Sequence, residues 1–373
     1  MLFSSSLLSL LLPVAYASTL DRRNDTVACN NSPSLCDKSY GEITHLGAHD
    51  SPFVRDESTD FSTSGNQFYN TTVQLSAGVR LVTGQVHKEN NELHMCHTSC
   101  ELLDAGTLES WLKEIKAWLD DNPNDVVTVL LVNSDNVDAA TLGASFEAAE
   151  IADYAYTPSA PDGSQSWPTL QELIDANTRL MAFVASLSSD SSVPYLMNEF
   201  DYIFETPFEN TAPSNFSCQP DRPKSLRGDL SGALASGRLP LVNHFLYSDA
   251  GLGIQVPNVD AIDTTNGDSG EGNLEEAATT CQEEYSGRQP TFLLVDFFDK
   301  GSTFTVLDKL NNVTDATGRR AVPGTNEQST NSGGKKSALK SLVNQAKAGA
   351  RPSIGNWIWV GGSWGVLGGG LAF

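Results

Sequence analysis

Residues 107–133 read TLESWLKEIKAWLDDNPNDVVTVLLVN, and this stretch indicates the class of fold. Its large apolar residues between positions 108 and 119 recur every three or four positions, which is typical of one buried face of a helix. Thr107 is suited to cap the start of this helix, and the NPN sequence at 122–124 ends it. The nearly all-apolar run at 126–132 is typical of a parallel strand buried on both faces. A helix that leads directly into such a strand predicts an α/β fold.

The chain between residues 40 and 312 continues this alternation of strands and helices. Further strands are predicted at 43–46, 79–84, 93–97, 180–184, 202–204, 239–245 and 292–295, and further helices at 142–151, 170–177 and 303–310. Eight strands in a body of this size favour a single-domain, distorted TIM (β/α)8 barrel. A doubly wound open sheet is the alternative, but we find neither G-x-G-x-x-G nor a Walker loop at a first strand end.

The overall composition limits the classes of function. The 373 residues include 23 Lys and Arg against 46 Asp and Glu, a formal net charge of −23. With 39% apolar residues the chain can bury a core, which excludes wholesale disorder. The acidity argues against a nucleic-acid partner, because phosphate recognition needs clustered Lys and Arg, and it disfavours electrostatic docking on anionic lipid. We expect an acidic, soluble monomer.

The two ends of the chain resemble processing signals. Residues 1–17 combine an apolar run with a small-residue cleavage pattern at 15–17, which predicts a secretory signal peptide. Residues 18–39 would form an N-terminal segment and residues 313–373 a C-terminal tail. The tail ends in an uncharged, Gly-rich apolar stretch that follows small residues at 348–350, a pattern similar to a glycolipid-anchor (GPI) signal. A buried or edge segment is the alternative, so we expect a secreted protein with an anchored form as an option.

The cysteines and asparagines agree with secretion. Six cysteines permit many pairings, but their spacing suggests two local disulfides and one long-range disulfide. The predicted pairs are Cys29–Cys36, Cys96–Cys100 and Cys218–Cys281. A zinc site is the weaker alternative, because the close pairs lack matching partners. Acceptors for N-glycosylation begin at Asn24, Asn30, Asn70, Asn215 and Asn312.

Polar residues gather where the predicted strands end, which is where barrel enzymes place their chemistry. All six histidines fall on these segments. Two imidazoles that face one pocket can act as base and acid, because an unperturbed histidine titrates at about pH 6.5. Adjacent carboxylates would fix the tautomers, and Asp50 and Asp296 are placed for that task. Any single histidine here is alternatively an ordinary hydrogen-bonded residue at a strand end.

Five stretches carry a family resemblance: THLGAHDSPF at 44–53, AGVRLVTGQVH at 77–87, ELHMCHTSC at 92–100, the segment 107–133 and TFLLVDFF at 291–298. Together they resemble the X-domain of phosphatidylinositol-specific phospholipase C, and most of all the secreted fungal PLC-like phosphodiesterases. The resemblance covers about residues 40–300. It implies a distorted TIM barrel whose substrate is a phosphoinositide or a glycerophosphodiester-like molecule.

The resemblance also implies a role for each catalytic candidate. His49 would be the general base that activates a hydroxyl for intramolecular attack on phosphorus, and His97 the general acid that protonates the departing alcohol. Asp296 would orient His49, and Asp50 would support His97. A cyclic phosphodiester would form first and would then be opened by water.

One position departs from the bacterial members, which have Asp-x-Arg at the end of the second strand and use the arginine to neutralise the phosphate. The matching residues here are Thr83 and Gln85. Glutamine donates hydrogen bonds without a charge, so we expect Gln85 to contact the substrate, with His87 or Lys88 as substitutes for the charge. The calcium-dependent relatives have carboxylates at this strand end, and none is present here. We therefore expect no cofactor and no obligatory metal.

Four further residues are candidates for binding sugar or inositol hydroxyls, although each suits an ordinary polar position equally well: Asn133, Glu205, Asn243 and His244. Two other functions remain open. The missing arginine favours a catalytically silent barrel that binds glycans or lipids. A glycosidase would need paired carboxylates, which Asp50, Glu205 and Asp296 would supply, but histidines at the strand ends argue against it.

Overall fold

The computed structural model describes residues 27–188, 190–250 and 254–324. The predicted signal peptide, the acceptor Asn24 and the tail from residue 325 onward lie outside the described residues. No helix within the described ranges is both long enough and apolar enough to cross a membrane.

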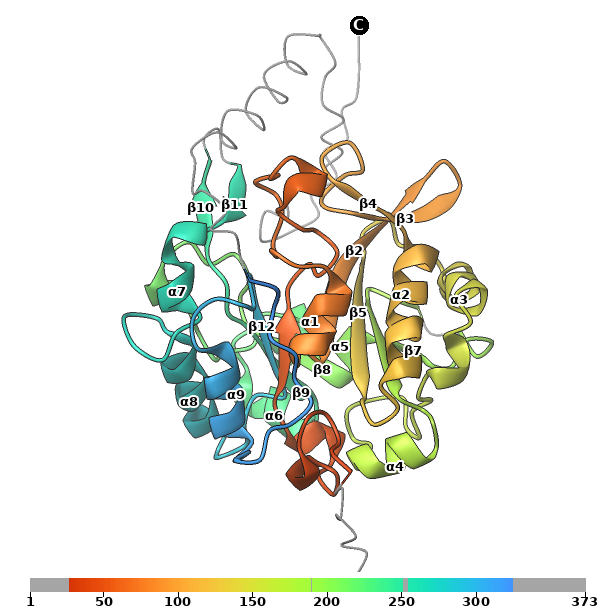
Figure 1. The fold of residues 1–373 in the computed structure, drawn as a ribbon. Coiled ribbons are helices and arrows are strands. Elements are labelled where there is room, and N and C mark those ends of the chain that lie inside the picture. The colour runs from red at the N-terminus through yellow and green to blue at the C-terminus, as the bar shows by residue number, and fades with distance from the viewer. Residues whose placement is uncertain (1–26, 189, 251–253, 325–373) are drawn as a thin grey trace, which may run out of the picture.

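Eight parallel strands curl into an incomplete barrel at the centre of the molecule (Figure 1). Their bounds are β1 (His45–Ala48), β2 (Leu81–Glu89), β5 (Val127–Asn133), β6 (Leu180–Ala185), β7 (Leu196–Asn198), β8 (Ile203–Glu205), β9 (Leu239–Asn243) and β12 (Phe292–Val295). Their order is β7-β6-β5-β2-β1-β12-β9-β8. Within the described ranges no ladder joins β7 to β8, which are linked by the short helix α5 (Glu199–Tyr202). The prediction of a distorted TIM barrel is confirmed.

The prediction of a barrel strand at 93–97 is wrong. β3 (Glu92–Cys96) runs antiparallel to β2, and β4 (Asp104–Thr107) runs antiparallel to β3. Both residues of the β2–β3 turn, Asn90 and Asn91, have positive φ (48° and 68°), which suits a two-residue hairpin and which asparagine tolerates. The barrel strand that the sequence prediction lacks is β7, whose three residues are too few to show a period.

Helices cover the outer face of the curled sheet (Figure 1). They are α1 (Thr71–Ala77), α2 (Leu108–Asp121), α3 (Ala139–Ala148), α6 (Leu230–Ala235), α8 (Leu274–Glu284) and α9 (Thr303–Leu310). The helix α4 (Leu170–Asp175) instead packs its buried leucines into the cluster that the sheet encloses, and α7 (Ile262–Thr265) is a short helix that precedes α8. The predicted cap of α2 forms, with Thr107 Oγ1 accepting a hydrogen bond from Ser110 N at 3.2 Å. A separate antiparallel pair, β10 (Tyr247–Asp249) and β11 (Gln255–Pro257), lies at the same end of the molecule as β3 and β4 (Figure 1).

Successive residues of a strand point alternately into two apolar clusters. On β5, Val129 and Leu131 belong to the cluster that includes the outer helices, whereas Leu130 belongs to the cluster that the curled sheet encloses. On β12, Val295 faces outward and Leu294 inward in the same way. Continued past the end of each strand, this alternation determines which polar side chains reach the interior of the barrel.

The three predicted disulfides are present: Cys29–Cys36, Cys96–Cys100 and Cys218–Cys281. The glycosylation acceptors Asn70, Asn215 and Asn312 are exposed. Asn30 does not fit the prediction, because its side chain is 6% exposed and its Oδ1 accepts a hydrogen bond from Val126 N at 2.7 Å. A side chain packed in this way leaves no room for a glycan.

The segments on both sides of the predicted barrel also pack against it. Asn31 of the N-terminal segment accepts hydrogen bonds from Arg80 Nη2 (2.7 Å) and from Thr317 N (2.8 Å). Arg319 forms a two-pronged ion pair with Asp308 of α9. The packed body therefore extends beyond 40–312 at both ends.

Candidate active site

The pairing of β1 with β12 brings His49 and Asp296 together. Each follows its strand by one residue, and Ala48 is the register partner of Val295. His49 Nδ1 lies 2.9 Å from Asp296 Oδ1, and Asn66 Nδ2 donates to the same oxygen at 2.9 Å. Because a carboxylate only accepts hydrogen bonds, Nδ1 carries a hydrogen and Nε2 is left for the pocket. The Asp296 side chain is 1% exposed, so the hydrogen bond that orients the imidazole is buried and lies on the side of the ring away from the pocket.

Asp50 lies between two imidazoles. Its Oδ2 is 3.7 Å from His49 Nε2 and 3.6 Å from His97 Nε2. Its backbone is left-handed (φ 48°), and its N–H donates to Thr83 Oγ1 at 2.9 Å. This conformation places Asp50 beside His49, although neighbouring residues of a regular strand point to opposite faces. One buried carboxylate therefore faces both rings.

His97 reaches this site from the β3–β4 loop and not from a barrel strand. The Cys96–Cys100 disulfide closes the loop around it, and Phe53 meets the ring edge-on with centroids 5.3 Å apart. The His49 ring is stacked on Phe245, with centroids 3.9 Å apart. Each histidine side chain stays 15% exposed.

The pKa values of the two histidines are shifted in opposite directions. For His49, burial acts to lower the pKa, but the charges of Asp50 and Asp296 together raise it above its ordinary value. For His97, burial lowers the pKa more than the charge of Asp50 raises it. Repulsion from His49 lowers the pKa of His97 further. A single proton held by the pair therefore resides on His49 in the free protein.

This arrangement can be compared with known proteins. The family model described as PI-PLC X 1 matches residues 35–311. The chain belongs to the PI-PLC X family. It is 37% identical over 307 residues to the PI-PLC X domain-containing protein 1 of Arthroderma benhamiae, covering 82% of this chain and 96% of that relative.

A second protein of the same fungus, named an uncharacterized secreted protein, is 41% identical over 298 residues to this PI-PLC X chain. The match covers 78% of this chain but 65% of the relative, so the chain spans less than two thirds of that protein's length. Among solved structures, the phosphatidylinositol-specific phospholipase C from Listeria monocytogenes matches with a TM-score of 0.50 at 16% identity, covering 74% of this chain and 95% of that chain. This likeness concerns the fold alone.

The PI-PLC X barrel holds a second charged group at the ends of β8 and β9. Glu205 is ion-paired with Arg222 and accepts a hydrogen bond from Asn243 Nδ2 at 2.9 Å. Burial and the charge of Glu205 raise the pKa of the buried Glu199 well above its ordinary value. Burial acts to raise the pKa of Glu205, but Arg222 and the surrounding hydrogen bonds lower it. The Glu205 charge also contributes to the raised pKa of His49.

The strand alternation separates the predicted substrate residues of the PI-PLC X barrel into two sets. Gln85, Glu205 and Asn243 occupy inward positions on their strands. Asn133 and His244 occupy outward positions on or directly after their strands and point toward the helices. They therefore do not fit the prediction that they line the substrate pocket.

The contacts of these two residues agree with a structural role. Asn133 bonds the backbone of Val137 through both ends of its amide, at 2.8 Å each. His244 is wholly buried, its Nε2 lies 2.8 Å from Thr265 O, and burial lowers its pKa to about 4. His87 lies on the hairpin, where its Nδ1 is 3.5 Å from Asp135.

Sequence reasoning missed Asn66, Glu199, Arg222 and Phe245. An isolated loop asparagine or arginine has no period and matches no motif, so no signal pointed to Asn66 or Arg222. Phe245 was within reach of prediction, because it lies two residues beyond the inward Asn243.

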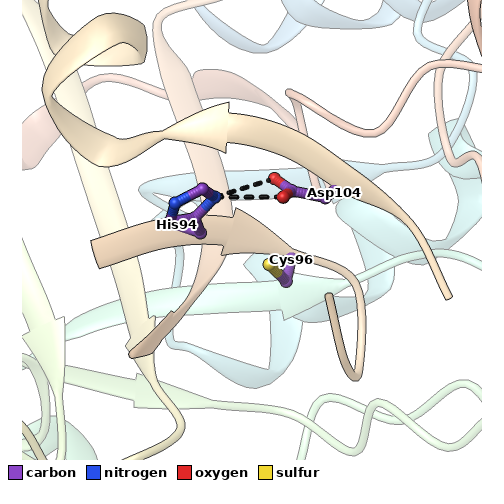
Figure 2. A group of neighbouring side chains, drawn as sticks. All are labelled: His94, Cys96 and Asp104. Atoms are coloured by element: carbon purple, nitrogen blue, oxygen red, sulfur yellow. Dashed lines mark hydrogen bonds and ion pairs between the residues drawn. The ribbon is translucent and has the colours of Figure 1, made fainter. Parts of the chain in front are cut away.

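One cluster of the PI-PLC X chain has metal-ligand residue types. Single ligand atoms of His94, Cys96 and Asp104 lie within 4.8 Å of one another (Figure 2). Cys96 is bonded to Cys100, however, so its sulfur is not the thiolate that metal binding requires. His94 Nδ1 lies 3.0 and 3.2 Å from the two oxygens of Asp104, as the dashed lines in Figure 2 show. We therefore interpret the cluster as a histidine–carboxylate pair beside a disulfide.

Proposed function

We propose that the chain is an extracellular phosphodiesterase of the phospholipase C type. One observation carries the proposal: two partly exposed imidazoles face a single buried carboxylate, and one of them is oriented by a second buried carboxylate. Family membership and the fold support the same conclusion. A glycosidase is disfavoured, because each of its candidate acids is already paired: Asp50 and Asp296 with histidines, and Glu205 with Arg222.

The proposed reaction starts from the form of the pair in which the single proton has moved from His49 to His97, and His49 Nε2 then accepts the proton of a hydroxyl adjacent to the phosphodiester. The hydroxyl oxygen then bonds to phosphorus, and the bond from phosphorus to the departing alcohol oxygen breaks. His97 donates its proton to that oxygen, which yields a cyclic phosphodiester and a free alcohol. Water opens the cyclic product with the two roles reversed. Each proton transfer contributes roughly 10²–10⁴-fold to the rate.

The pKa directions define the pH behaviour of this pair. The reaction needs one proton on the two histidines, and the two pKa values observed in a pH profile belong to the pair as a whole. Because the pKa of His49 is raised and that of His97 is lowered, the higher pKa of the pair sets the alkaline limit and the lower one sets the acidic limit. Activity should therefore follow a bell that extends to both sides of about pH 6.5.

Asp296→Asn should narrow the bell-shaped pH profile of activity by moving its alkaline limit to lower pH. The substitution removes a negative charge that raises the pKa of His49, so the alkaline limit should fall by about one to two pH units while the acidic limit changes less. The measurement is the pH dependence of kcat/KM. Asp268→Asn, at an exposed position, is the matched control and should leave both limits unchanged. An alkaline limit that stays in place in Asp296→Asn would show that another group sets it.

The test of the function is phosphorus NMR of phosphatidylinositol and of glycerophosphoinositol incubated with the purified protein, with and without EDTA. We expect a transient cyclic-phosphate signal that persists under chelation and is absent with His49→Ala and with His97→Ala. Loss of the signal with EDTA would establish a metal requirement. If no product forms from either substrate while the protein remains folded, the silent glycan- or lipid-binding barrel becomes the better proposal.

The extracellular location rests on the predicted signal peptide, the three disulfides and the name of the secreted relative. Disulfides persist in oxidising compartments, which agrees with secretion. The division into signal, barrel and anchor-bearing tail, the monomeric state, and the absence of a cofactor and of a nucleic-acid partner belong to the same proposal.

A further inference from the structure

We propose that Gln85 is a positioning residue for His97 and not a ligand of the substrate phosphate. This inference rests on the proposed function. Gln85 Nε2 donates to Asp50 Oδ2 at 2.8 Å, and Gln85 Oε1 accepts from Thr98 N at 2.9 Å. Both ends of its amide are therefore engaged inside the protein, one on the shared carboxylate and the other on the residue directly after His97.

The two partners require a side chain that donates at one end and accepts at the other. An arginine donates only, so it cannot accept from Thr98 N. A glutamate accepts only, so it would place a second carboxylate against Asp50 Oδ2. Glutamine meets both requirements and is long enough to span from β2 to the β3–β4 loop. Gln85 thus satisfies two internal partners that the arginine of the bacterial members could not satisfy together.

The loop that carries His97 is held at two places. The Cys96–Cys100 disulfide closes it covalently, and Gln85 holds Thr98. Thr98 has a left-handed backbone (φ 63°), and its Oγ1 lies 3.3 Å from His97 Nδ1. A left-handed threonine is unfavourable and persists only where contacts maintain it. Gln85 supplies one of these contacts and at the same time keeps Asp50 facing His97 Nε2.

Gln85→Met removes both hydrogen bonds with little change of shape. We expect kcat to fall on the order of 10- to 100-fold with KM nearly unchanged, because misplacing a catalytic group by about 1 Å has an effect of this size. In the His97→Ala background the same substitution should have almost no further effect, because residues that act as a unit are not additive. A phosphate ligand would instead raise KM and would act independently of His97.

Gln85→Arg separates the two roles by the sign of its effect. If position 85 binds phosphate, the arginine should raise kcat/KM above wild type. If Gln85 positions His97, the arginine should lower kcat/KM about as much as methionine does, because Thr98 N loses its acceptor and a cation competes with His97 for Asp50. Gln219→Arg, the same change at an exposed position, is the control. A rise in kcat/KM with Gln85→Arg would overturn the proposal.

A substrate-free measurement keeps this inference distinct from the proposed function. In Gln85→Met the Thr98 amide should exchange with solvent faster, and its NMR resonance and those of the His97 ring should shift, while the Asp296-bound Nδ1 proton of His49 stays in place. Unchanged Thr98 and His97 signals would refute the positioning role. Failure of the wild-type protein to turn over any phosphodiester would refute the proposed function but leave this result standing.

Discussion

His97→Ala is expected to slow cleavage of an alkyl phosphodiester by about 10²–10⁴-fold, but to slow cleavage of the corresponding nitrophenyl ester far less. The physical reason is that glycerol leaves as a strongly basic alkoxide and needs a proton from the acid, whereas nitrophenolate leaves without one. His49→Ala removes the proposed base, which activates the nucleophile, and should slow cleavage of both substrates by a similar factor.

Initial rates for inositol phosphodiesters with glycerol and with nitrophenol as leaving groups measure this difference. The proposed assignment gives a ratio of the two rates that changes strongly in His97→Ala and little in His49→Ala. The reverse pattern would exchange the roles of the two histidines. The reverse assignment has to be tested, because the proton of the pair resides on His49 in the free protein, as it would if His49 were the acid.

Arg222→Met is expected to destabilise the fold by about 3 kcal/mol at neutral pH, the lower end of the range for removing one partner of a buried ion pair, because the Arg222 side chain is itself 27% exposed. Glu205 is 3% exposed, and Glu199 beside it is fully buried, so the substitution leaves a carboxylate without its cation. The guanidinium also lies 4.4 Å from the centre of the Phe208 ring, a contact that methionine only partly replaces.

The loss should depend on pH in a defined direction. In the wild type the pKa of Glu205 is depressed, so the pair stabilises the fold above the unfolded-state pKa of about 4.3, and this contribution is lost as the pH falls through the folded pKa. The difference in the free energy of unfolding between wild type and Arg222→Met should therefore become smaller at acidic pH. Urea unfolding at pH 7 and at about pH 4 measures it.

Arg227→Met is the matched control for this experiment. Arg227 belongs to the same loop and is paired with Asp221, but its side chain is 47% exposed. Exposed ion pairs contribute at most about 1 kcal/mol, so this variant should stay close to wild type. Equal losses in the two variants would show that the loop, and not the buried pair, determines the stability.

The barrel was predictable because its long elements carry strong periods. The α2–β5 unit has an amphipathic helix with a polar cap followed by an apolar strand, and each of these features predicts the same helix-to-strand unit of an α/β fold. β3 was assigned to the barrel because its alternation is that of any strand, and only the Asn90-Asn91 turn distinguishes a hairpin from a parallel strand. β7 was missed because three residues cannot show a period.

The candidate site was predictable where the side chain follows directly on an inward strand position, as for His49 and Asp296. Asn133 and His244 were assigned to the pocket because proximity to a strand end was used without counting the alternation. Arg222 comes from a long loop, and its approach to Glu205 depends on tertiary packing that no local pattern records. The role of Gln85 required the position of Thr98, which is set by the disulfide loop.

The pairing of the first barrel strand with the last has a consequence for the order of assembly. His49 and Asp296 are 247 residues apart in the chain, whereas the β2–β3 hairpin closes over a two-residue turn. Contacts of high sequence separation form late, because the entropy of closing the intervening chain must be overcome first. A chain still emerging from the ribosome therefore has no carboxylate behind His49 until β12 has been synthesised. The proposed general base becomes oriented only when the barrel is complete, so under the proposed mechanism a partly made chain would be inert toward the phosphodiesters of the cell that makes it.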